Sequence, residues 1–370
     1  MSDAKIIPIT MPKWGLSMVE GKVIEWLVEE NATIAVGDEI IDIETEKIAN
    51  TFEALDGGVL KRKVAAADET LPIGALLGVL ADADTPETEV DAFIAEFQAN
   101  YVPPEIDDEE DAGPGYERVE VDGYDLRYLR LGDGADAVIL IHGFGGDLDG
   151  WLLTQQPLSA TGSVYALDLP GHGQSTKALR DGSVSALAEV VAKFMDALGI
   201  ARAHLVGHSL GGAIALQTAI SHTDKVSALS LIASAGLGRE INGAYLNGFV
   251  AAESRREIKP LLQQLVADPA LINRTLIDDI LKFKRLDGVT AALGTVAQAF
   301  VDGDMQKIDL RDALGGLNIP VRVIWGSVDK IIPAAHADGL PDNVDIHILD
   351  GYGHLVQLEA ASEVNKLLQG

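Results

Sequence analysis

One short pattern constrains the fold of this chain more than any other. Residues 203–219, AHLVGHSLGGAIALQTA, place Gly207-His208-Ser209-Leu210-Gly211 between a short apolar run and a helical pattern. A Gly-x-Ser-x-Gly serine in this context occupies a sharp strand-to-helix turn, with its hydroxyl exposed at the carboxyl edge of a sheet. The flanking glycines allow a strained turn that passes close to its neighbours. The pattern predicts a nucleophilic Ser209; the alternative is a serine that only caps a helix.

The segments around this turn predict a mainly parallel sheet. Buried strands are expected in VILIHGFGG (138–146), SVYALDLPGHGQS (163–175), VSALSLIASA (226–235) and PVRVIWGSVD (320–329), and a helix in 185–199. Strands that alternate with helices favour a sheet covered on both faces, here over residues 116–370. Residues 236–312 interrupt the alternation and are mainly helical by pattern, so we expect an inserted lid.

A serine nucleophile requires a base and an acid. The base should be a histidine late in the chain, and His354 in GYGHLVQLE is preferred over His336 and His347. His347 alternates with apolar residues in a strand pattern, and His336 begins an alanine-rich helical pattern. Asp329, after the strand of WGSVD, is the expected acid, with Asp350 as its competitor.

An oxyanion hole needs two backbone N–H donors. The expected donors are Leu210, directly after the nucleophile, and Phe144, in the loop after the His-Gly strand. His142 and His208 are interpreted as supports of their loops, and Asp168 as a structural residue of a strand-end turn. We expect no metal centre, since the chain has no cysteine for thiolate ligands.

The first 84 residues contain a weak internal repeat. At an offset of 36, Gly21 and Val23 match Gly57 and Val59, and with one extra residue Gly37 matches Gly74. Short apolar pieces between glycine and aspartate turns predict strands. Two similar halves suggest a small β-sandwich, whose midpoint falls at Glu46-Lys47-Ile48. We therefore expect a hairpin that presents Lys47 to solvent.

Residues 85–115 differ from both flanking regions. They include ten acidic residues and no basic ones, with several prolines, as expected for a flexible linker. Within them Val90, Phe93, Ile94 and Phe97 follow the spacing of a one-faced helix. This helix either packs on a neighbouring domain or docks a partner protein. The chain thus divides into a carrier domain (1–84), a linker (85–115) and a catalytic domain (116–370, lid 236–312).

Two family resemblances follow from these motifs. HGFGGD, DLPGHGQS, GHSLGG, WGSVDKIIP and GYGHLVQLE stand in the order seen in the α/β-hydrolase superfamily. The segment DIETEKIANTFEA, with glycines ten residues on each side of Lys47, resembles lipoyl domains. That resemblance implies lipoate in amide linkage to Lys47. Biotin carriers share the fold but usually place methionine on both sides of the lysine, where this chain has Glu46 and Ile48.

The two halves together resemble the dihydrolipoamide acetyltransferase components of acetoin dehydrogenase complexes. The resemblance implies acetyl transfer from dihydrolipoyl-Lys47 to coenzyme A. It also implies a thiamine-diphosphate enzyme that loads the arm and a flavin-dependent dihydrolipoamide dehydrogenase that reoxidises it. A plain hydrolase tethered to its carrier domain, and a carrier scaffold without catalysis, are the alternatives.

Composition limits the partners and the location. The net charge of −29 argues against general binding to nucleic acid or anionic lipid. The absence of a signal-peptide pattern, of an 18-residue apolar run and of cysteine favours a cytoplasmic protein, and a homo-oligomer is possible. Coenzyme A is an anion, so its binding requires a region that is less negative than the rest of the chain. The lid, with ten basic and eleven acidic residues, is the candidate region for coenzyme A binding. A solvated helix face of mixed charge explains this composition equally well.

Overall fold

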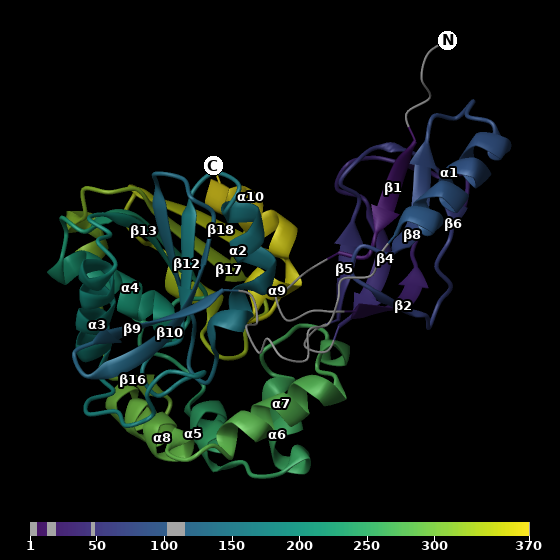
Figure 1. Ribbon diagram of the computed structural model, residues 1–370. Helices are drawn as coiled ribbons and strands as arrows, with labels where there is room; N and C mark the ends of the chain where they lie inside the picture. The colour runs from purple at the N-terminus through teal and green to yellow at the C-terminus, as the bar shows by residue number, and fades with distance from the viewer. Residues whose placement is uncertain (1–5, 13–19, 46–48, 102–114, 370) are drawn as a thin grey trace. The chain divides into compact units, whose positions relative to one another are not determined.

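The structure is a computed structural model that describes residues 6–12, 20–45, 49–101 and 115–369. The chain divides into two compact units, Met1–Gly113 and Pro114–Gly370. Each is described below by itself (Figure 1).

The first unit is a β-sandwich. Over the described residues, one sheet has the order β1-β8-β6-β3 and the other β5-β4-β2-β7. The strands are β1 (Ile7–Thr10), β2 (Glu20–Trp26), β3 (Thr33–Ile34), β4 (Glu39–Glu44), β5 (Ala49–Glu53), β6 (Gly58–Lys63), β7 (Thr70–Pro72) and β8 (Leu76–Ala81). Their apolar side chains, among them Val23, Ile41 and Leu60, form one core. Each sheet takes strands from both sequence halves, as expected for a two-fold repeat.

The repeat is visible in the turns. Gly37 and Gly74, which match in the sequence, both have positive φ, 90° and 77°. This backbone conformation costs glycine least, because glycine has no Cβ. Strands β4 and β5 pair antiparallel, with Glu44 opposite Ala49. Lys47 lies outside the described residues.

A helix completes the first unit. Helix α1 (Glu87–Asn100) packs on β6 and β8, and its Val90 is fully buried in a cluster with Leu76 and Val79. Arg62 of β6 pairs with Glu87 at 2.8 Å and with a second acidic residue of the helix. The acidic stretch therefore includes a helix docked on the preceding domain, because its apolar face covers that domain's sheet.

The second unit contains an eight-stranded sheet, in the order β18-β17-β14-β13-β11-β12-β10-β9. Its strands are β9 (Tyr116–Val121), β10 (Tyr124–Leu131), β11 (Ala137–Ile141), β12 (Ser163–Leu167), β13 (Ala203–His208), β14 (Val226–Ile232), β17 (Val321–Gly326) and β18 (Val344–Leu349). The pairs from β12 to β18 are parallel, and β9 and β10 are antiparallel. The predicted mainly parallel sheet is confirmed.

Helices cover both faces of this sheet. Helices α3 (Val184–Ala197) and α4 (Leu210–Ser221) pack together on one face, and α2 (Leu152–Leu158), α9 (Val356–Glu359) and α10 (Ala361–Gln369) cover the other (Figure 1). Short 3₁₀ helices are η1 (Leu148–Trp151), η2 (Pro269–Leu271), η3 (Arg311–Gly316) and η4 (Ala334–Ala337). The buried residues of the sheet and these helices form a continuous core.

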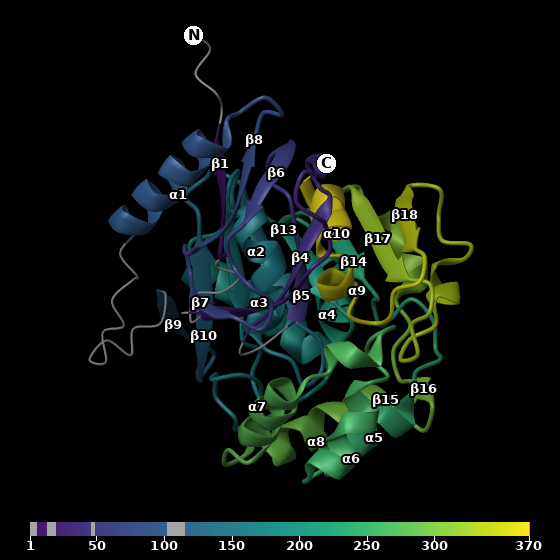
Figure 2. The same ribbon diagram turned by 90° about the vertical axis from the view of Figure 1, so that its right-hand side faces the viewer.

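The expected lid is mainly helical. It contains α5 (Gly243–Ala251), α6 (Arg255–Leu262), α7 (Arg274–Lys284) and α8 (Val289–Phe300), followed by the small pair β15 (Val301–Asp302) and β16 (Met305–Gln306). Figures 1 and 2 both show the four helices gathered at one end of the unit.

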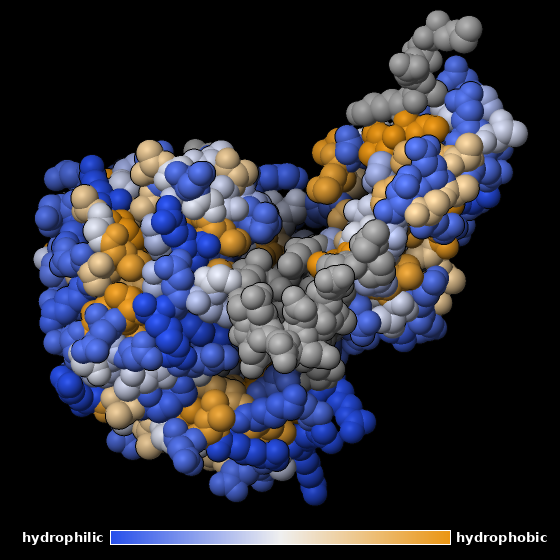
Figure 3. All heavy atoms as spheres, viewed as in Figure 1, coloured by the Kyte–Doolittle hydropathy of each residue, from blue (hydrophilic) through white to orange (hydrophobic). Residues whose placement is uncertain are grey.

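The second unit is mostly polar on the face drawn in Figure 3, with small separate hydrophobic areas. Among the described residues, no helix combines the length and apolarity needed to cross a membrane.

Candidate active site

Ser209 occupies the turn between β13 and α4 with a strained backbone. Its φ of 55° and ψ of −118° are unusual for a residue with a side chain. The turn is fixed on both sides, since Ser209 N–H donates to Ile232 O at 2.9 Å and Ala235 N–H donates to Ser209 O at 3.0 Å. Strain stored at one rigidly supported residue is typical of functional sites. The predicted strand-to-helix turn is therefore present, and the role of Ser209 as nucleophile stays a prediction.

The glycines around Ser209 have little space for a side chain. A Cβ on Gly207 would lie 2.2 Å from Gly211 O, and one on Gly211 would lie 2.1 Å from Ile141 O. Distances this short are impossible for real carbon–oxygen contacts, so the backbone would have to move. The glycines therefore permit α4 to start directly against β11 and β13.

His354 and Asp329 lie in contact. His354 Nδ1 is 2.7 Å from Asp329 Oδ2. Because a carboxylate only accepts, Nδ1 carries the proton, which leaves Nε2 as the ring nitrogen available to exchange a proton. Both side chains are almost fully buried, with 3% and 0% exposure.

Asp329 accepts four hydrogen bonds. Besides His354, Trp325 Nε1–H donates to Oδ2 at 3.0 Å, and the N–H groups of Ile331 and Ile332 donate to Oδ1 at 2.8 and 3.0 Å. Burial alone would raise the pKa of the Asp329 carboxyl, but the facing His354 and the N–H groups of Ile331 and Ile332 hold that pKa below its usual value. The aspartate is thus ionised at neutral pH and able to stabilise a charged His354.

The competing residues have other partners. Asp350 is exposed and accepts a hydrogen bond from Ser327 Oγ at 3.0 Å. His336 Nε2 lies 2.8 Å from Glu240 Oε2. His347 Nε2 lies 2.9 Å from Asp345 Oδ1. The structure therefore pairs His354 with Asp329 and leaves these three residues outside that pair.

His208 connects the serine turn to the His354 loop. Its Nε2–H donates to His354 O at 2.9 Å, and the two rings are 4.8 Å apart. Burial, reinforced by the nearby His354, lowers the pKa of His208 to about 3, so its ring is neutral. Within the part of the chain that the structure describes, no hydrogen bond joins Ser209 Oγ to the His354 ring. The two loops are adjacent, and the serine–histidine contact remains a prediction.

The two expected oxyanion donors lie on elements next to the serine. Leu210 is the first residue of α4, so its N–H has no partner within the helix. The preceding loop also lies close, since a Cβ on Gly143 would be 3.1 Å from Ser209 Cβ. No hydrogen bond within the described ranges uses the N–H of Leu210 or Phe144. Both groups are thus available to a ligand oxygen.

His142 supports this loop, as predicted from its position. Its Nδ1–H donates to Gly143 O at 2.8 Å, and its Nε2 accepts from Leu169 N–H at 3.0 Å. Burial lowers the pKa of His142, so the ring is neutral. Asp168 is fully buried and pairs with Arg127 at 2.8 Å, which agrees with a structural role.

Sequence reasoning missed Glu359. Its Oε1 accepts Gly353 N–H at 2.9 Å, and its Oε2 accepts Ala267 N–H at 2.7 Å. Leu355 N–H also donates to Leu265 O at 2.9 Å. The residues on each side of His354 are therefore attached to the lid. The only signal was the position of a glutamate five residues after His354, which specifies no partner.

The fold and the site define an α/β-hydrolase-fold protein with an attached biotinyl/lipoyl-type domain. The family model described as alpha/beta hydrolase fold matches residues 136–361, and that described as biotin-requiring enzyme matches residues 7–80. Among solved structures, a meta-cleavage product hydrolase from Pseudomonas fluorescens IP01 is similar, with a TM-score of 0.62 and 26% identity. The match covers 68% of this chain and 95% of that one.

Two relatives match almost the whole chain. The dihydrolipoyllysine-residue acetyltransferase component of the acetoin cleaving system of Pseudomonas putida is 50% identical, over 98% of this chain and 97% of that protein. The component of the same name from Cupriavidus necator is 47% identical, over 98% and 96%. The chain belongs to this family of acetoin-system acetyltransferase components.

Proposed function

We propose that this protein transfers an acetyl group between a dihydrolipoyl group on Lys47 and coenzyme A. The observation that carries the proposal is the contact of His354 with Asp329 in the loop beside the strained Ser209. This site can form an acyl-enzyme, and the same chain has a domain of the biotinyl/lipoyl type. The names of the two relatives support the same reaction.

In the first half-reaction, Ser209 takes the acyl group. Its hydroxyl gives its proton to His354 Nε2, and its oxygen attacks the thioester carbonyl carbon. The carbon–sulfur bond breaks, and the leaving thiolate takes the proton from His354. The products are a Ser209 ester and a free thiol. Asp329 stabilises the histidine cation that exists between the two proton transfers.

In the second half-reaction, the thiol of coenzyme A accepts the acyl group. His354 takes the thiol proton, and the thiolate attacks the Ser209 ester carbon. The ester bond breaks, and the serine oxygen recovers the proton from His354. In both halves the N–H groups of Leu210 and Phe144 would stabilise the oxyanion. Direct attack of coenzyme A on the thioester, with His354 as base, is the alternative route.

The first unit suits a carrier role. Strands β4 and β5 form an antiparallel pair, and the sequence between their paired ends, Glu44 and Ala49, contains Lys47. Lipoate in amide linkage to this lysine would supply a dithiol that carries the acyl group. A carrier tethered to the catalytic unit maintains a high local substrate concentration, about millimolar for a flexible tether. A thiamine-diphosphate enzyme and a flavin-dependent dehydrogenase would be its partners in a multienzyme complex.

A second candidate function is hydrolysis. The observation that favours it is the similarity of residues in the second unit to a meta-cleavage product hydrolase. Because both functions need the same Ser209 chemistry, only the acceptor distinguishes them.

The test is acyl transfer from acetyl-CoA to free dihydrolipoamide, with release of acetate followed in parallel. Wild type and Ser209→Ala are compared, since the free substrate removes any dependence on modification of Lys47. We expect transfer by wild type and its loss in the variant. Acetate release without thiol-to-thiol transfer would overturn the proposal in favour of the hydrolase. Transfer that persists in Ser209→Ala would instead favour direct attack by the thiol.

A further inference from the structure

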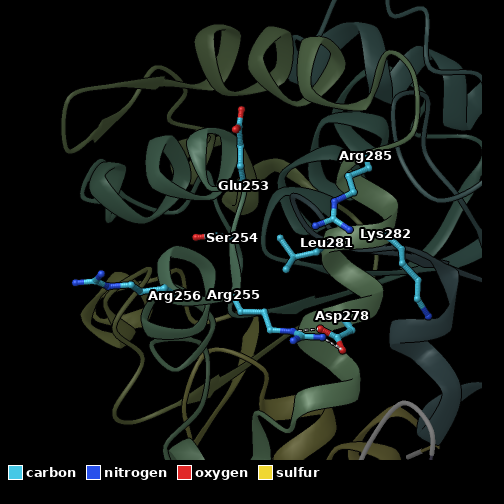
Figure 4. A pocket seen from close by; sticks show the side chains of 8 residues that line it. All are labelled: Glu253, Ser254, Arg255, Arg256, Asp278, Leu281, Lys282 and Arg285. Carbon is cyan, nitrogen blue, oxygen red and sulfur yellow. Dashed lines mark hydrogen bonds and ion pairs between the residues drawn. The ribbon is translucent and has the colours of Figure 1, made fainter.

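The lid contains a cavity of about 590 Å³ between α6 and α7 (Figure 4). Cavities of this size accommodate small organic ligands. The lining residues are mainly charged: Glu253, Ser254, Arg255, Arg256, Asp278, Leu281, Lys282 and Arg285. Four are cations and two are carboxylates, within a chain whose net charge is −29. The cavity is therefore a local positive region in a strongly acidic protein.

The cations differ in their partners. Arg255 is paired through its guanidinium with Asp278, and Lys282 lies 2.8 Å from Asp279. Arg256 and Arg285 are exposed and form no ion pair with any residue that the structure describes. Figure 4 shows the Arg285 guanidinium turned toward Leu281, while Arg256 extends outward on the opposite side. Neither guanidinium is held by an ion pair among the described residues, so Arg285 can contact an anion in the cavity directly, and Arg256 can do so once its side chain turns toward the cavity.

The lining also includes one apolar residue, Leu281. Leu281 is 4% exposed and belongs to the core of the second unit. A guanidinium recognises phosphate with two parallel hydrogen bonds and stacks on flat rings. A guanidinium near one apolar side chain suits a ligand that combines phosphate groups with a flat, weakly polar ring. A phosphorylated nucleotide has this chemistry.

A short chain of contacts links the cavity to the candidate active site. Lys284, next to Arg285, donates to the backbone oxygens of Phe249 and Val250. The Phe249 ring lies 5.9 Å from the Phe144 ring, and a Cβ on Gly145 would be 2.6 Å from Phe249. The end of α7, next to the cavity, and the expected oxyanion loop therefore both contact the lid helix α5.

We propose that this cavity binds the phosphorylated adenosine of coenzyme A, with Arg256 and Arg285 as the phosphate ligands. The inference rests on the proposed acetyltransferase function, in which the thiol end of coenzyme A reaches Ser209. The pantetheine arm then spans from the cavity toward the loop of Phe144. The positive cavity attracts this anion, whereas the negative charge of the rest of the protein repels it.

The first test compares substrates with and without the nucleotide. Acetyl transfer to dihydrolipoamide is measured for the full-length wild type and for the Arg256→Gln/Arg285→Gln double variant. The acetyl donor is either acetyl-CoA or acetyl-pantetheine. We expect the variant to raise the KM for acetyl-CoA at least about tenfold, since it loses two charge-assisted contacts. The KM for acetyl-pantetheine should stay unchanged. Lys366→Gln, at an exposed position of α10, is the control for a lost cation elsewhere and should alter neither value.

The second test measures binding without turnover. Calorimetry with 3′,5′-ADP, the nucleotide fragment of coenzyme A, should show binding to wild type that is lost in the double variant. Equal binding by both would overturn the proposal, as would equal changes of the two KM values. Arg285→Lys, which keeps the charge, should recover part of the affinity.

The experiments distinguish failure of the acetyltransferase function from failure of the nucleotide site. If wild type releases acetate without transferring acetyl, the acetyltransferase function is wrong, while the binding experiment still decides the nucleotide site. An unchanged urea midpoint of the double variant shows that it is folded. The double variant could instead lose only acetyl transfer to or from the lipoyl domain, with both small-molecule KM values unchanged. This result would indicate a protein docking site at the cavity and overturn the nucleotide assignment.

Discussion

Replacement of Asp329 by asparagine is the most informative perturbation of the candidate site. The carboxylate accepts from four N–H donors, two on each oxygen. An asparagine amide has one oxygen and one NH₂ group, and the NH₂ group cannot accept. The amide nitrogen therefore either leaves the two donors to Oδ1 without an acceptor, or leaves Trp325 Nε1–H with Ile332 O alone and requires His354 to change its tautomer.

The two orientations fail in different ways. If the amide nitrogen takes the place of Oδ1, it opposes the N–H groups of Ile331 and Ile332 and destabilises the loop. If it takes the place of Oδ2, it opposes Trp325 Nε1–H and forces His354 Nδ1 to accept. The histidine proton then moves to Nε2, and the ring can no longer act as a base toward Ser209.

The expected losses follow from these contacts. In the first orientation, the two unmet donors cost about 2–4 kcal/mol of stability. The wrong histidine tautomer lowers kcat by about 10⁴, the loss measured for the equivalent change in a serine protease. Urea unfolding measures the first quantity, and the acetyl-CoA–dihydrolipoamide assay measures the second. Adding Asp329→Asn to Ser209→Ala should cost little further activity, because the residues act as a unit.

Asp350→Asn is the matched control. It is also an aspartate near the end of a sheet strand, but it is exposed and bonded to Ser327. We expect its kcat to remain within about threefold of wild type, since surface changes of this kind have small effects. Full activity of Asp329→Asn together with loss of activity in Asp350→Asn would refute the assignment of the acid.

The same residue makes a pH prediction. Because the pKa of Asp329 is lowered in the folded protein, its ionised form adds stability above the ordinary carboxyl pKa of about 3.9. That contribution disappears as the pH falls through the lower, folded-state value. The stability difference between wild type and Asp329→Asn should therefore be constant near neutrality and shrink below about pH 4. A difference that grows in acid would contradict the lowered pKa.

Three further predictions concern other parts of the chain. Glu359→Gln should lower kcat with little change in KM, because it removes one acceptor from the Gly353–lid connection; an unchanged kcat would deny it a positioning role. Lys47→Arg should abolish mass-detected lipoylation while leaving transfer to free dihydrolipoamide intact, and persistent modification would place lipoate elsewhere. Gly211→Ala should lower the urea midpoint and reduce activity, because its Cβ would lie 2.1 Å from Ile141 O; a wild-type midpoint would show that the turn can relax.

The sequence predicts the elements of the site better than their contacts. Ser209 follows from a local pattern, since the glycines and the strand-to-helix switch are neighbours in the chain. His354 and Asp329 follow from chain order and from the ends of strands. These are features of short segments, and the structure places all three segments at one edge of the parallel sheet.

Long-range contacts leave no comparable signal. The bond of Glu359 to Ala267 joins residues 92 positions apart, and nothing in GYGHLVQLE specifies a lid partner. The acidic stretch is an intermediate case. Its composition favours a linker, whereas the spacing of its apolar residues predicts a one-faced helix that packs on a neighbouring domain or on a partner. The structure shows the first of these, with Val90 of α1 fully buried against β8. The outcome depends on the neighbouring domain rather than on the stretch itself.

The chemistry at Ser209 does not by itself decide between a transferase and a hydrolase. A serine ester can be resolved by water or by a thiol, with His354 as the base in both cases. The choice depends on which acceptor is already beside the ester when it forms. A cationic cavity in the lid would raise the local concentration of an anionic thiol, and a tether would do the same for the acyl donor. Salt weakens the first effect but barely alters the reaction of water. The rate of acylation is then a property of Ser209, His354 and Asp329, whereas the ratio of thiolysis to hydrolysis is a property of the lid.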